Sequence, residues 1–459
     1  MEPKVSSELD ALKDLSREDL IAIILEQRAM LADFKKRISE LEKQLGLDGP
    51  EPPAGPVIKP NTLKGLRKKR KPRASHFARR REVSTDTVHH VPETCPDCGR
   101  RLSGGGPGRS RQVIDIEMAP VKVTEHVFHY RWCGVCRKRV RASADLSHLV
   151  SGRRRIGHRL ASWIANLHIN GRIPLRTVQS ILKQSHGVHV SLGEMTDLLT
   201  LIAEKGEPAL EAIKQEIASS ECKFADETGW REDGQYRCLW AVSTALSRLF
   251  HIDPHRTTDV AMTLLGSKIN GVLVTDFLYV YNRIAGRHQR CWAHFDRALD
   301  KLLLLHPNRT DLYGWVDAVK DLWKQARDYR AFCLSKPRFG AGIFDRQRKR
   351  AEFEKSLYAL AEPFQEADSV MFPQATLAKR IGMFLSELFT FVEFPEVPDD
   401  NNAAERSIRP AVILRKVCGG TRSEKGSRVK AALMSHFGTW KARGKDPIQA
   451  CLDLLRASP

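Results

Sequence analysis

The sequence has no stretch of 18 or more apolar residues, the length that an apolar helix needs to cross a bilayer. Its N-terminus also lacks the charged-then-apolar pattern of a signal peptide. Acidic residues are in short supply, since 55 Asp and Glu stand against 75 Lys and Arg, for a formal net charge of +20. These absences argue against a membrane partner and favour a polyanion, most simply nucleic acid. We expect a cytoplasmic, nucleoid-associated bacterial protein.

Cysteine is too scattered for a disulfide scaffold, because six of the ten stand singly. The other four form two Cys-X-X-Cys pairs that are separated by 34 residues: Cys95, Cys98, Cys133 and Cys136. Four thiolates in two such pairs predict a structural zinc ion, because no position remains open for water. A redox pair, the alternative, would not need the second pair. We predict a zinc ribbon with a β-hairpin insert made of residues 112–116 and 121–128.

A heptad seam runs through residues 20–45, where apolar residues recur at alternating spacings of four and three. Gln27 is its one polar position. This pattern predicts a coiled coil, and with it a homodimer or a higher oligomer. The alternative is an amphipathic helix that lies on its own protein.

Residues 64–81 hold ten Lys and Arg residues and no acid. Such a block repels itself and is typical of a disordered arm that contacts phosphates without reading sequence. A linker that only improves solubility is the alternative. The candidate DNA contacts here are Arg67, Lys68, Lys69, Arg70 and Lys71.

Three short helical patterns follow at residues 160–169, 174–184 and 191–203. Their tight turns are typical of a helix-turn-helix, in which the last helix, opened by Ser191, enters a major groove of DNA. Compact helical triplets are also ordinary packing modules, so a connector role stays open.

An α/β region then begins near residue 218. Strand-like runs occupy residues 222–225, 236–243, 248–252 and 271–275, and a helical pattern fills 257–265 before the last of them. A fifth strand is expected near residues 288–292. This order opens the ribonuclease H fold, a mixed α/β sheet. Residues 302–388 are helical nearly throughout, which predicts an insertion that contacts DNA or a partner subunit, or one that is a passive support.

Two carboxylates fall where these strands are expected to end. Asp226 follows the first strand and Asp276 follows the strand 271–275. Residues 401–410 predict a short helix that Pro410 stops, with Glu405 on its polar face. Three converging carboxylates suit Mg²⁺ or Mn²⁺, and two such ions can activate a nucleophile and steady a leaving oxygen in phosphodiester chemistry.

Several motifs resemble the insertion-sequence-sixty-six transposase family. They are Ala225-Asp-Glu-Thr-Gly-Trp230, Thr275-Asp276 with Tyr279 and Tyr281, Cys291-Trp-Ala-His294, and Asp400-Asn-Asn-Ala-Ala-Glu-Arg-Ser-Ile-Arg-Pro410 with Arg415-Lys416. The resemblance implies a ribonuclease-H-like domain that cuts and joins DNA with an Asp-Asp-Glu triad at Asp226, Asp276 and Glu405. It covers nearly the whole chain. Phe277 departs from it, because the family usually has Gly after the second Asp.

Other residues near these motifs are expected to assist. Cys291 and His294 lack further metal-ligand partners in the sequence, which favours hydrogen bonding around the site over metal binding. Arg409, Arg415 and Lys416 are candidate DNA contacts, and residues 416–430 are predicted to form a basic loop that holds the scissile backbone. Residues 440–455 predict one closing helix.

The expected whole is a multidomain α+β and α/β protein. Its predicted parts are a coiled coil (1–48), a basic disordered linker (49–90), a zinc ribbon (91–150), a helix-turn-helix-like region (151–217), the catalytic core (218–305 and 391–435), a helical insertion (306–390) and a C-terminal helix (436–459). The predicted partners are double-stranded DNA, at element ends and target, and accessory proteins of the same element. The competing function is an inactive zinc-bearing DNA-binding regulator descended from a transposase.

Overall fold

The computed structural model describes residues 30, 83–104, 111–114, 121–335 and 342–457. The basic arm at residues 64–81, and the predicted coiled coil except Met30, lie outside the described residues. The chain divides into two compact units, residues 1–114 and 115–459, and each is described by itself. Within the described residues, no helix combines the length and the apolar character that crossing a membrane requires.

Each cysteine pair lies on a tight turn of its own unit. In the first unit the amide of Gly99 donates to the carbonyl of Cys95 (2.9 Å), and Thr94 pairs with Arg101 across the turn. In the second unit β1 (Tyr130–Cys133) and β2 (Lys138–Arg141) form an antiparallel hairpin whose turn carries Cys136.

The hairpin prediction for residues 112–116 and 121–128 is therefore wrong where the structure describes it. Residues 112–114 and 121–128 form no strand. Alternation of side chains makes a strand only where a partner supplies the hydrogen bonds. The strands that do pair in this region are β1 and β2, which the turn after Cys133 joins.

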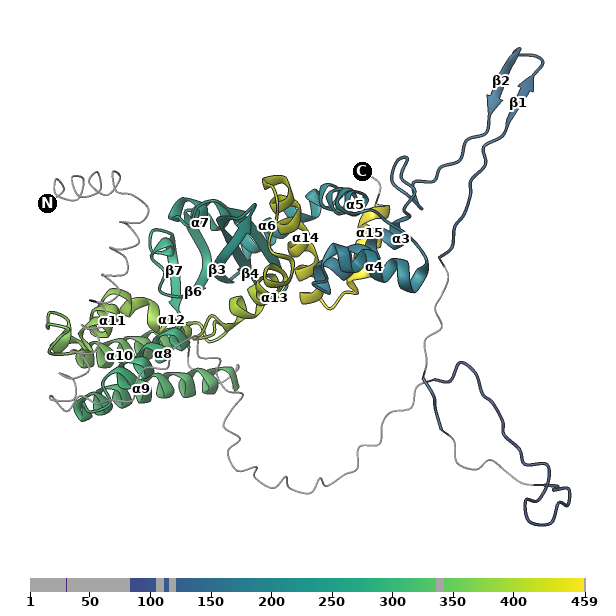
Figure 1. Ribbon diagram of the computed structural model, residues 1–459. Coiled ribbons are helices and arrows are strands. Elements are labelled where there is room, and N and C mark those ends of the chain that lie inside the picture. Colours follow the sequence, from purple (N-terminus) through teal and green to yellow (C-terminus); the bar gives the residue numbers. More distant parts are fainter. Residues whose placement is uncertain (1–29, 31–82, 105–110, 115–120, 336–341, 458–459) are drawn as a thin grey trace. The chain divides into compact units, whose positions relative to one another are not determined.

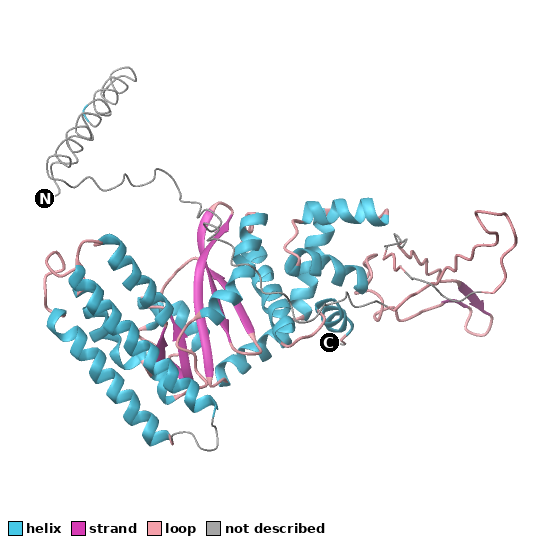
Figure 2. Ribbon diagram, turned by 90° about the horizontal axis from the view of Figure 1, so that it is seen from below, coloured by secondary structure: helices cyan, strands magenta, loops and turns pink. Residues whose placement is uncertain are grey.

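A five-stranded mixed sheet forms the centre of the second unit (Figure 2). Its strands lie in the order β5-β4-β3-β6-β7; the pairs β3–β4 and β4–β5 are antiparallel, and β6 is parallel to β3 and β7. Helix α7 (Thr258–Leu265) connects β5 to β6. The mixed α/β architecture is confirmed. The strands are β3 (Cys222–Glu232), β4 (Gln235–Ser243), β5 (Arg248–Asp253), β6 (Lys268–Thr275) and β7 (Ala285–Arg290).

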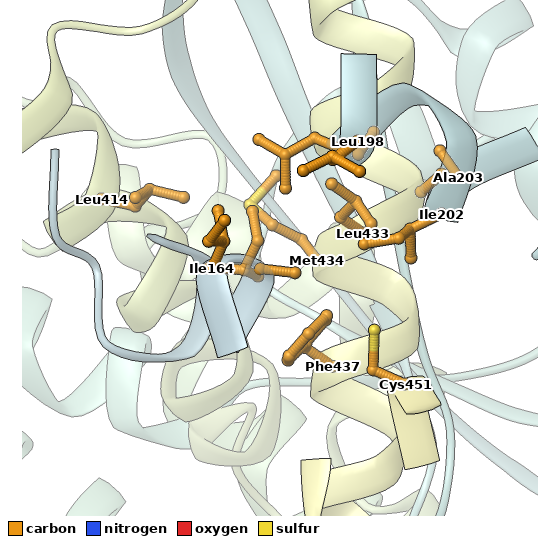
Figure 3. Packing of buried hydrophobic residues seen from close by; sticks show 14 of the residues in the cluster. Ile164, Leu198, Ile202, Ala203, Leu414, Leu433, Met434, Phe437 and Cys451 are labelled. Carbon is orange, nitrogen blue, oxygen red and sulfur yellow. The ribbon is translucent and has the colours of Figure 1, made fainter. Parts of the chain in front are cut away.

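Helices cover both faces of this sheet (Figure 1). One face, with Trp230 and Phe250, shares a core with the helices that precede the sheet and with the last three of the chain, and Figure 3 shows part of that core. The opposite face packs against α6 and α7. The helices are α3 (His158–Ala165), the π-helical turn η1 (Asn166–Asn170), α4 (Leu175–His186), α5 (Leu192–Lys205), α6 (Glu207–Ser219), α13 (Asn402–Cys418), α14 (Glu424–Ala442) and α15 (Pro447–Arg456).

The segment between β7 and α13 is helical, as predicted, and has a core of its own. Trp292 stacks on Trp323 there, with ring centroids 5.5 Å apart. A short 3-10 turn, η2 (Tyr279–Tyr281), precedes β7. The elements of the segment are α8 (Trp292–Leu305), α9 (Thr310–Ser335), α10 (Ile343–Ala361), η3 (Glu362–Phe364), α11 (Ala375–Leu388) and α12 (Thr390–Glu393).

Three predictions about the C-terminal region are wrong. Pro410 does not stop a helix, since α13 continues through it to Cys418. Proline removes one backbone hydrogen bond, but Pro410 is exposed and the buried stripe of Ala404, Ile408, Ala411 and Leu414 holds both halves on the sheet. The helix ends instead at Gly419, whose positive φ of 75° forms a left-handed cap.

The expected basic loop at residues 416–430 is likewise the end of α13, a short link and the start of α14. In that link Gly420 lies so close to strand β3 that a Cβ would collide with the carbonyl oxygen of Arg231. The predicted helix 440–455 is two helices, because α14 ends at Ala442 and Asp446 caps α15.

Candidate active site

Asp226 is the fifth residue of β3, the central strand of the sheet, and does not lie at a strand end as the sequence suggested. The strand continues because its second half, through Glu232, pairs with β4. Asp276 does follow the last residue of its strand, β6. The parallel register pairs Phe224 with Val274, so Asp226 and Asp276 come two residues later at the same level of neighbouring strands.

The carboxyl group of Asp226 is partly buried and charged neighbours surround it. Burial, followed by the negative charges of Glu227, Asp276 and Glu405, raises its pKa from 3.8 to about 7. Its Oδ1 accepts the amide of Glu227 at 2.9 Å. Among the described residues it enters no ion pair. Asp226 is thus a carboxylate whose negative charge the protein leaves uncompensated.

Helix α13 is fixed to the same strand by its first residues. The side-chain amide of Asn401 donates to the carbonyl of Ala225 (2.8 Å), next to Asp226. The backbone amide of Asn401 donates to Sγ of Cys291 (3.1 Å). These bonds place Glu405, in the first turn of α13, over β3. Cys291 therefore contacts the peptide that begins the helix.

Asp226 and one face of α13 line a common hollow of about 290 Å³. The residues of α13 that line it are Asn402, Glu405, Arg406, Ile408, Arg409 and Val412. The polar face predicted for residues 401–410 is therefore the face that meets Asp226. Two guanidinium groups stand in the same hollow as two carboxylates, which suits a phosphate flanked by cations.

Glu405 points to basic partners. Its Oε1 lies 3.1 Å from Nη2 of Arg297 and 3.8 Å from Nε2 of His294. Burial lowers the pKa of His294, and Arg297 lowers it further, against the opposing effect of Asp276 and Glu405. Within the part of the chain that the structure describes, no three His, Cys, Asp or Glu side chains are gathered closely enough to hold a metal ion.

A buried arginine that the sequence did not indicate holds the peptide of Asp276. The side chain of Arg290, 0% exposed, donates from Nη1 to the carbonyl of Asp276 (3.0 Å) and to Oγ1 of Thr275 (3.2 Å). It also pairs with Glu387 of α11 and lies over the ring of Phe384. Arg290 thus connects the second carboxylate to the helical segment.

Phe277, which follows Asp276, packs into that segment as well. Its ring lies 6.0 Å from that of Phe295 and 5.4 Å from that of Phe384. Its φ is not among the positive values of the described residues, so no glycine is needed there. Phe277 thus anchors the helical segment beside the site.

Glu227, which follows Asp226, has the contacts of a structural residue. Its side chain, 2% exposed, lies on the opposite face of β3 from Asp226, accepts the hydroxyl of Tyr281 (2.7 Å) and pairs with Arg256 (2.5 Å). Burial raises the pKa of Glu227, and both hydrogen bonds oppose that rise. Alternation along the strand was the available signal, but the partners are distant in sequence.

The predicted DNA contacts near α13 differ in their surroundings. Arg409 and Lys416 are exposed. Arg415 instead donates to the backbone carbonyl of Gly229 on β3. Arg415 therefore fastens α13 to the sheet through Nη1. The arm residues Arg67 to Lys71 lie outside the described residues.

The helix expected to enter a DNA groove is poorly suited to it. Ser191 does cap α5, accepting the amide of Glu194 at 3.1 Å. The exposed residues of α5 include Asp197 and Glu204, which phosphates would repel. Helix α4 exposes Arg176 and Lys183 instead. If this region contacts DNA, charge favours α4.

The four predicted zinc ligands are free thiols, two in each unit. Hydrogen bonds, first from the amide of Asp97, lower the pKa of Cys95. The amide of Cys136 lowers the pKa of Cys133 in the same way. Both turns therefore favour thiolates, the form that binds zinc.

Two regions of the chain match known families. Residues 92–137 match the zinc-finger binding domain of transposase IS66, a range that includes all four paired cysteines. Residues 153–429, more than half of the chain, match the Transposase IS66 family.

Two curated relatives come from Sinorhizobium fredii, strain NBRC 101917 / NGR234. Uncharacterized protein y4jO is 31% identical over 160 residues, which span 35% of this chain and 45% of that protein, less than half its length. Uncharacterized protein y4qI is 24% identical over 428 residues, 84% of this chain and 75% of that protein. The family matches carry the assignment: the chain belongs to the Transposase IS66 family.

Proposed function

We propose that this chain is a DNA transposase that binds element ends and performs metal-dependent strand cleavage and strand transfer. Asp226, Asp276 and Glu405 are its catalytic carboxylates. The proposal extends to a ribonuclease-H-like catalytic core, residues 218–305 and 391–435, which the helical insertion at 306–390 interrupts. The strand order β5-β4-β3-β6-β7, with three antiparallel strands followed by a crossover helix, supports that comparison.

One observation carries the catalytic proposal. Asp226 is a partly buried carboxylate without an ion pair among the described residues, and like charges help to raise its pKa to about 7. A structural carboxylate such as Glu227 has its positive partner in place. A site that concentrates negative charge without compensation gains stability when a hard cation binds, and oxygen ligands suit Mg²⁺ or Mn²⁺. The donor set therefore fits a divalent metal.

A bound divalent metal would supply an activated oxygen nucleophile and neutralise charge on the leaving oxygen. The chain contributes the rest. Arg290 fixes the peptide of Asp276, and Asn401 fixes the first turn of α13 beside Asp226. Arg406 and Arg409 stand at the hollow, where they hold the phosphate of the strand. The carboxylate of Glu405 breaks its contacts with Arg297 and His294 when it joins the site. The side chains of both partners are partly exposed to solvent, which allows this change.

The test uses purified protein, an element-end duplex and magnesium. Wild-type protein should cut the strand, whereas Asp226→Asn, Asp276→Asn and Glu405→Gln should each lose at least about a hundredfold of the rate, because each amide removes a ligand charge. DNA affinity, measured by gel shift, should persist in all three. Equal cutting by wild-type and Asp226→Asn protein would end this mechanism.

The competing function, an inactive zinc-bearing DNA-binding regulator, is favoured by one observation. The described residues do not gather three metal-binding side chains. A regulator would bind element DNA with the same affinity in wild-type and Asp226→Asn protein, and neither would cut. The cleavage assay therefore separates the two functions.

Cys95, Cys98, Cys133 and Cys136 hold a structural zinc ion in this proposal. The family match over residues 92–137 and the thiolate-favouring turns support it. Metal analysis of protein purified under reducing conditions should find one zinc per chain. Chelation should unfold residues 95–136 and leave the melting of the sheet nearly unchanged, because no described residue of this range belongs to the hydrophobic cores around the sheet. Protein without zinc would refute the assignment.

The remaining parts stay predictions. We propose double-stranded DNA as partner at element ends and target, with the arm of residues 64–81 and the exposed Arg409 and Lys416 as contacts. The same proposal includes dimerisation through residues 20–45 and accessory proteins of the same element. It also includes the remaining domain boundaries and a location at the nucleoid.

A further inference from the structure

A second hollow, of about 310 Å³, opens beside helix α13. Strand β5, helix α14, the end of η1 and Arg172 complete its wall. The hollow near Asp226 uses Glu405 and Arg409 of α13, whereas this one uses Ser407 and Ala411, and Arg406 lines both. The two hollows thus lie on adjacent sides of one helix, which is about 10 Å across with its side chains.

Positive charge dominates the second hollow. Four basic residues line it and no acidic residue does: Arg172, Arg248, Arg406 and Lys441. None of the four forms an ion pair among the described residues. Arg248 donates to the backbone carbonyl of Ser247 at 2.8 Å. Uncompensated cations around a concave surface attract an anion.

The floor of the same hollow is apolar. Phe250 of β5 and Leu414, Met434 and Phe437 of the flanking helices form it, and Figure 3 shows the last three within the core. A simple phosphate would use the cations and leave this floor in contact with water. The backbone of an intact duplex would do the same, because its bases are stacked inside. The hollow therefore suits an anion that also carries a flat apolar group.

We propose that this hollow binds one unstacked nucleotide of the DNA strand, next to the phosphodiester held at Asp226. The base lies on the apolar floor and a neighbouring phosphate contacts Arg406 and Lys441. Only the position relative to the cut rests on the proposed function. The preference for an unpaired nucleotide rests on the hollow alone.

The test measures binding without divalent metal, so no strand is cut. Two probes are compared by fluorescence anisotropy: a short duplex, and the same duplex with a single-stranded overhang. Wild-type protein should bind the overhang probe more tightly. Lys441→Ala, which removes a phosphate contact, should lower that preference by about fivefold, and Ser407→Leu, which fills the space for the base, should abolish it.

Lys355→Ala is the matched control, because Lys355 is exposed on α10 and lines neither hollow. Thermal melting identifies any variant that fails to fold, and Lys441→Ala, an exposed change, keeps the test decisive if Ser407→Leu does not fold. A wild-type protein without preference for the overhang, or a preference that survives in Lys441→Ala, would overturn the inference. Cleavage measured separately decides the catalytic proposal, so the two can fail independently.

Discussion

The two faces of strand β3 treat neighbouring carboxylates in opposite ways. On one face Glu227 has Arg256 and Tyr281 as partners, and on the other Asp226 has only a backbone amide as hydrogen-bond donor within the described residues. Burial raises the pKa of both carboxyl groups. Only Asp226 has three carboxylates of other residues adding to that rise. Burial alone therefore does not distinguish a candidate catalytic acid from a structural one. The distinguishing feature is the absence of a compensating positive charge.

Arg290 offers the strongest way to break this contrast, because it is a fully buried charge on the side of Asp276. Replacing it with Met removes four hydrogen bonds, leaves Glu387 unpaired and frees the peptide of Asp276. We expect a loss of about 3–5 kcal/mol in the free energy of unfolding and a fall of about ten- to a hundredfold in cleavage. Denaturant melts and the cleavage assay measure the two effects.

Arg290→Lys separates positioning from stability. Lysine restores the charge but cannot reproduce the fork of bonds to Thr275, Asp276 and Asn282. Cleavage should stay low while part of the stability returns. The exposed Arg287→Lys on the same strand is the control. Full cleavage in Arg290→Lys protein would contradict a positioning role.

Glu227→Gln tests the contrast between the two carboxylates on the opposite face of β3. The amide keeps an acceptor for Tyr281 but loses the ion pair with Arg256, so the free energy of unfolding should fall by about 1–3 kcal/mol. Cleavage per folded molecule should change little, because this carboxylate faces away from the hollow. Asp226→Asn should show the reverse pattern. Glu227→Gln protein of unchanged stability, or with cleavage as low as Asp226→Asn, would remove the distinction.

Much of this fold could be predicted from local sequence patterns. Helices α3, α4, α5 and α7 and strands β4, β5 and β6 follow from periodicity, and the mixed sheet follows from their order. Helix α6 was not predicted. The polar face of residues 401–410 was likewise readable, because helical spacing alone puts Glu405 and Arg409 on one side. These features depend on residues close together in the chain.

The errors share a physical cause, which is dependence on distant partners. Strand β3 continues past Asp226 because β4 pairs with it as far as Glu232, and α13 passes Pro410 because the sheet holds both halves. The role of Arg290 needs Glu387, 97 residues away. No local pattern contains such contacts, so the sequence predicted the acids better than the residues that hold them in place.

A third buried charge extends the comparison with a smaller effect. Lys430 of α14 is 9% exposed, and its amine contacts Nε2 of His168, whose Nδ1 lies 2.7 Å from the carbonyl of Ile173. Burial, and then the charge of Lys430, lower the pKa of His168 to about 4, so the imidazole is neutral near neutral pH and accepts from the amine. Cys418 is the other titratable group facing Lys430. Like Asp226, Lys430 has no opposite charge among the described residues.

The pH dependence of stability should reveal this buried amine. Burial lowers the pKa of Lys430 from 10.5 to about 8, so between these values the unfolded chain binds more protons than the folded one. The free energy of unfolding must then rise with pH across that range. Lys430→Met lacks this dependence, so its stability relative to wild type should be highest near about pH 7 and fall by roughly 2 kcal/mol toward about pH 10. Urea melts at both pH values measure the difference, with the exposed Lys355→Met as control. A difference that does not change with pH would mean that the amine keeps its proton in the fold, and that an uncompensated buried charge is tolerated here as it is at Asp226.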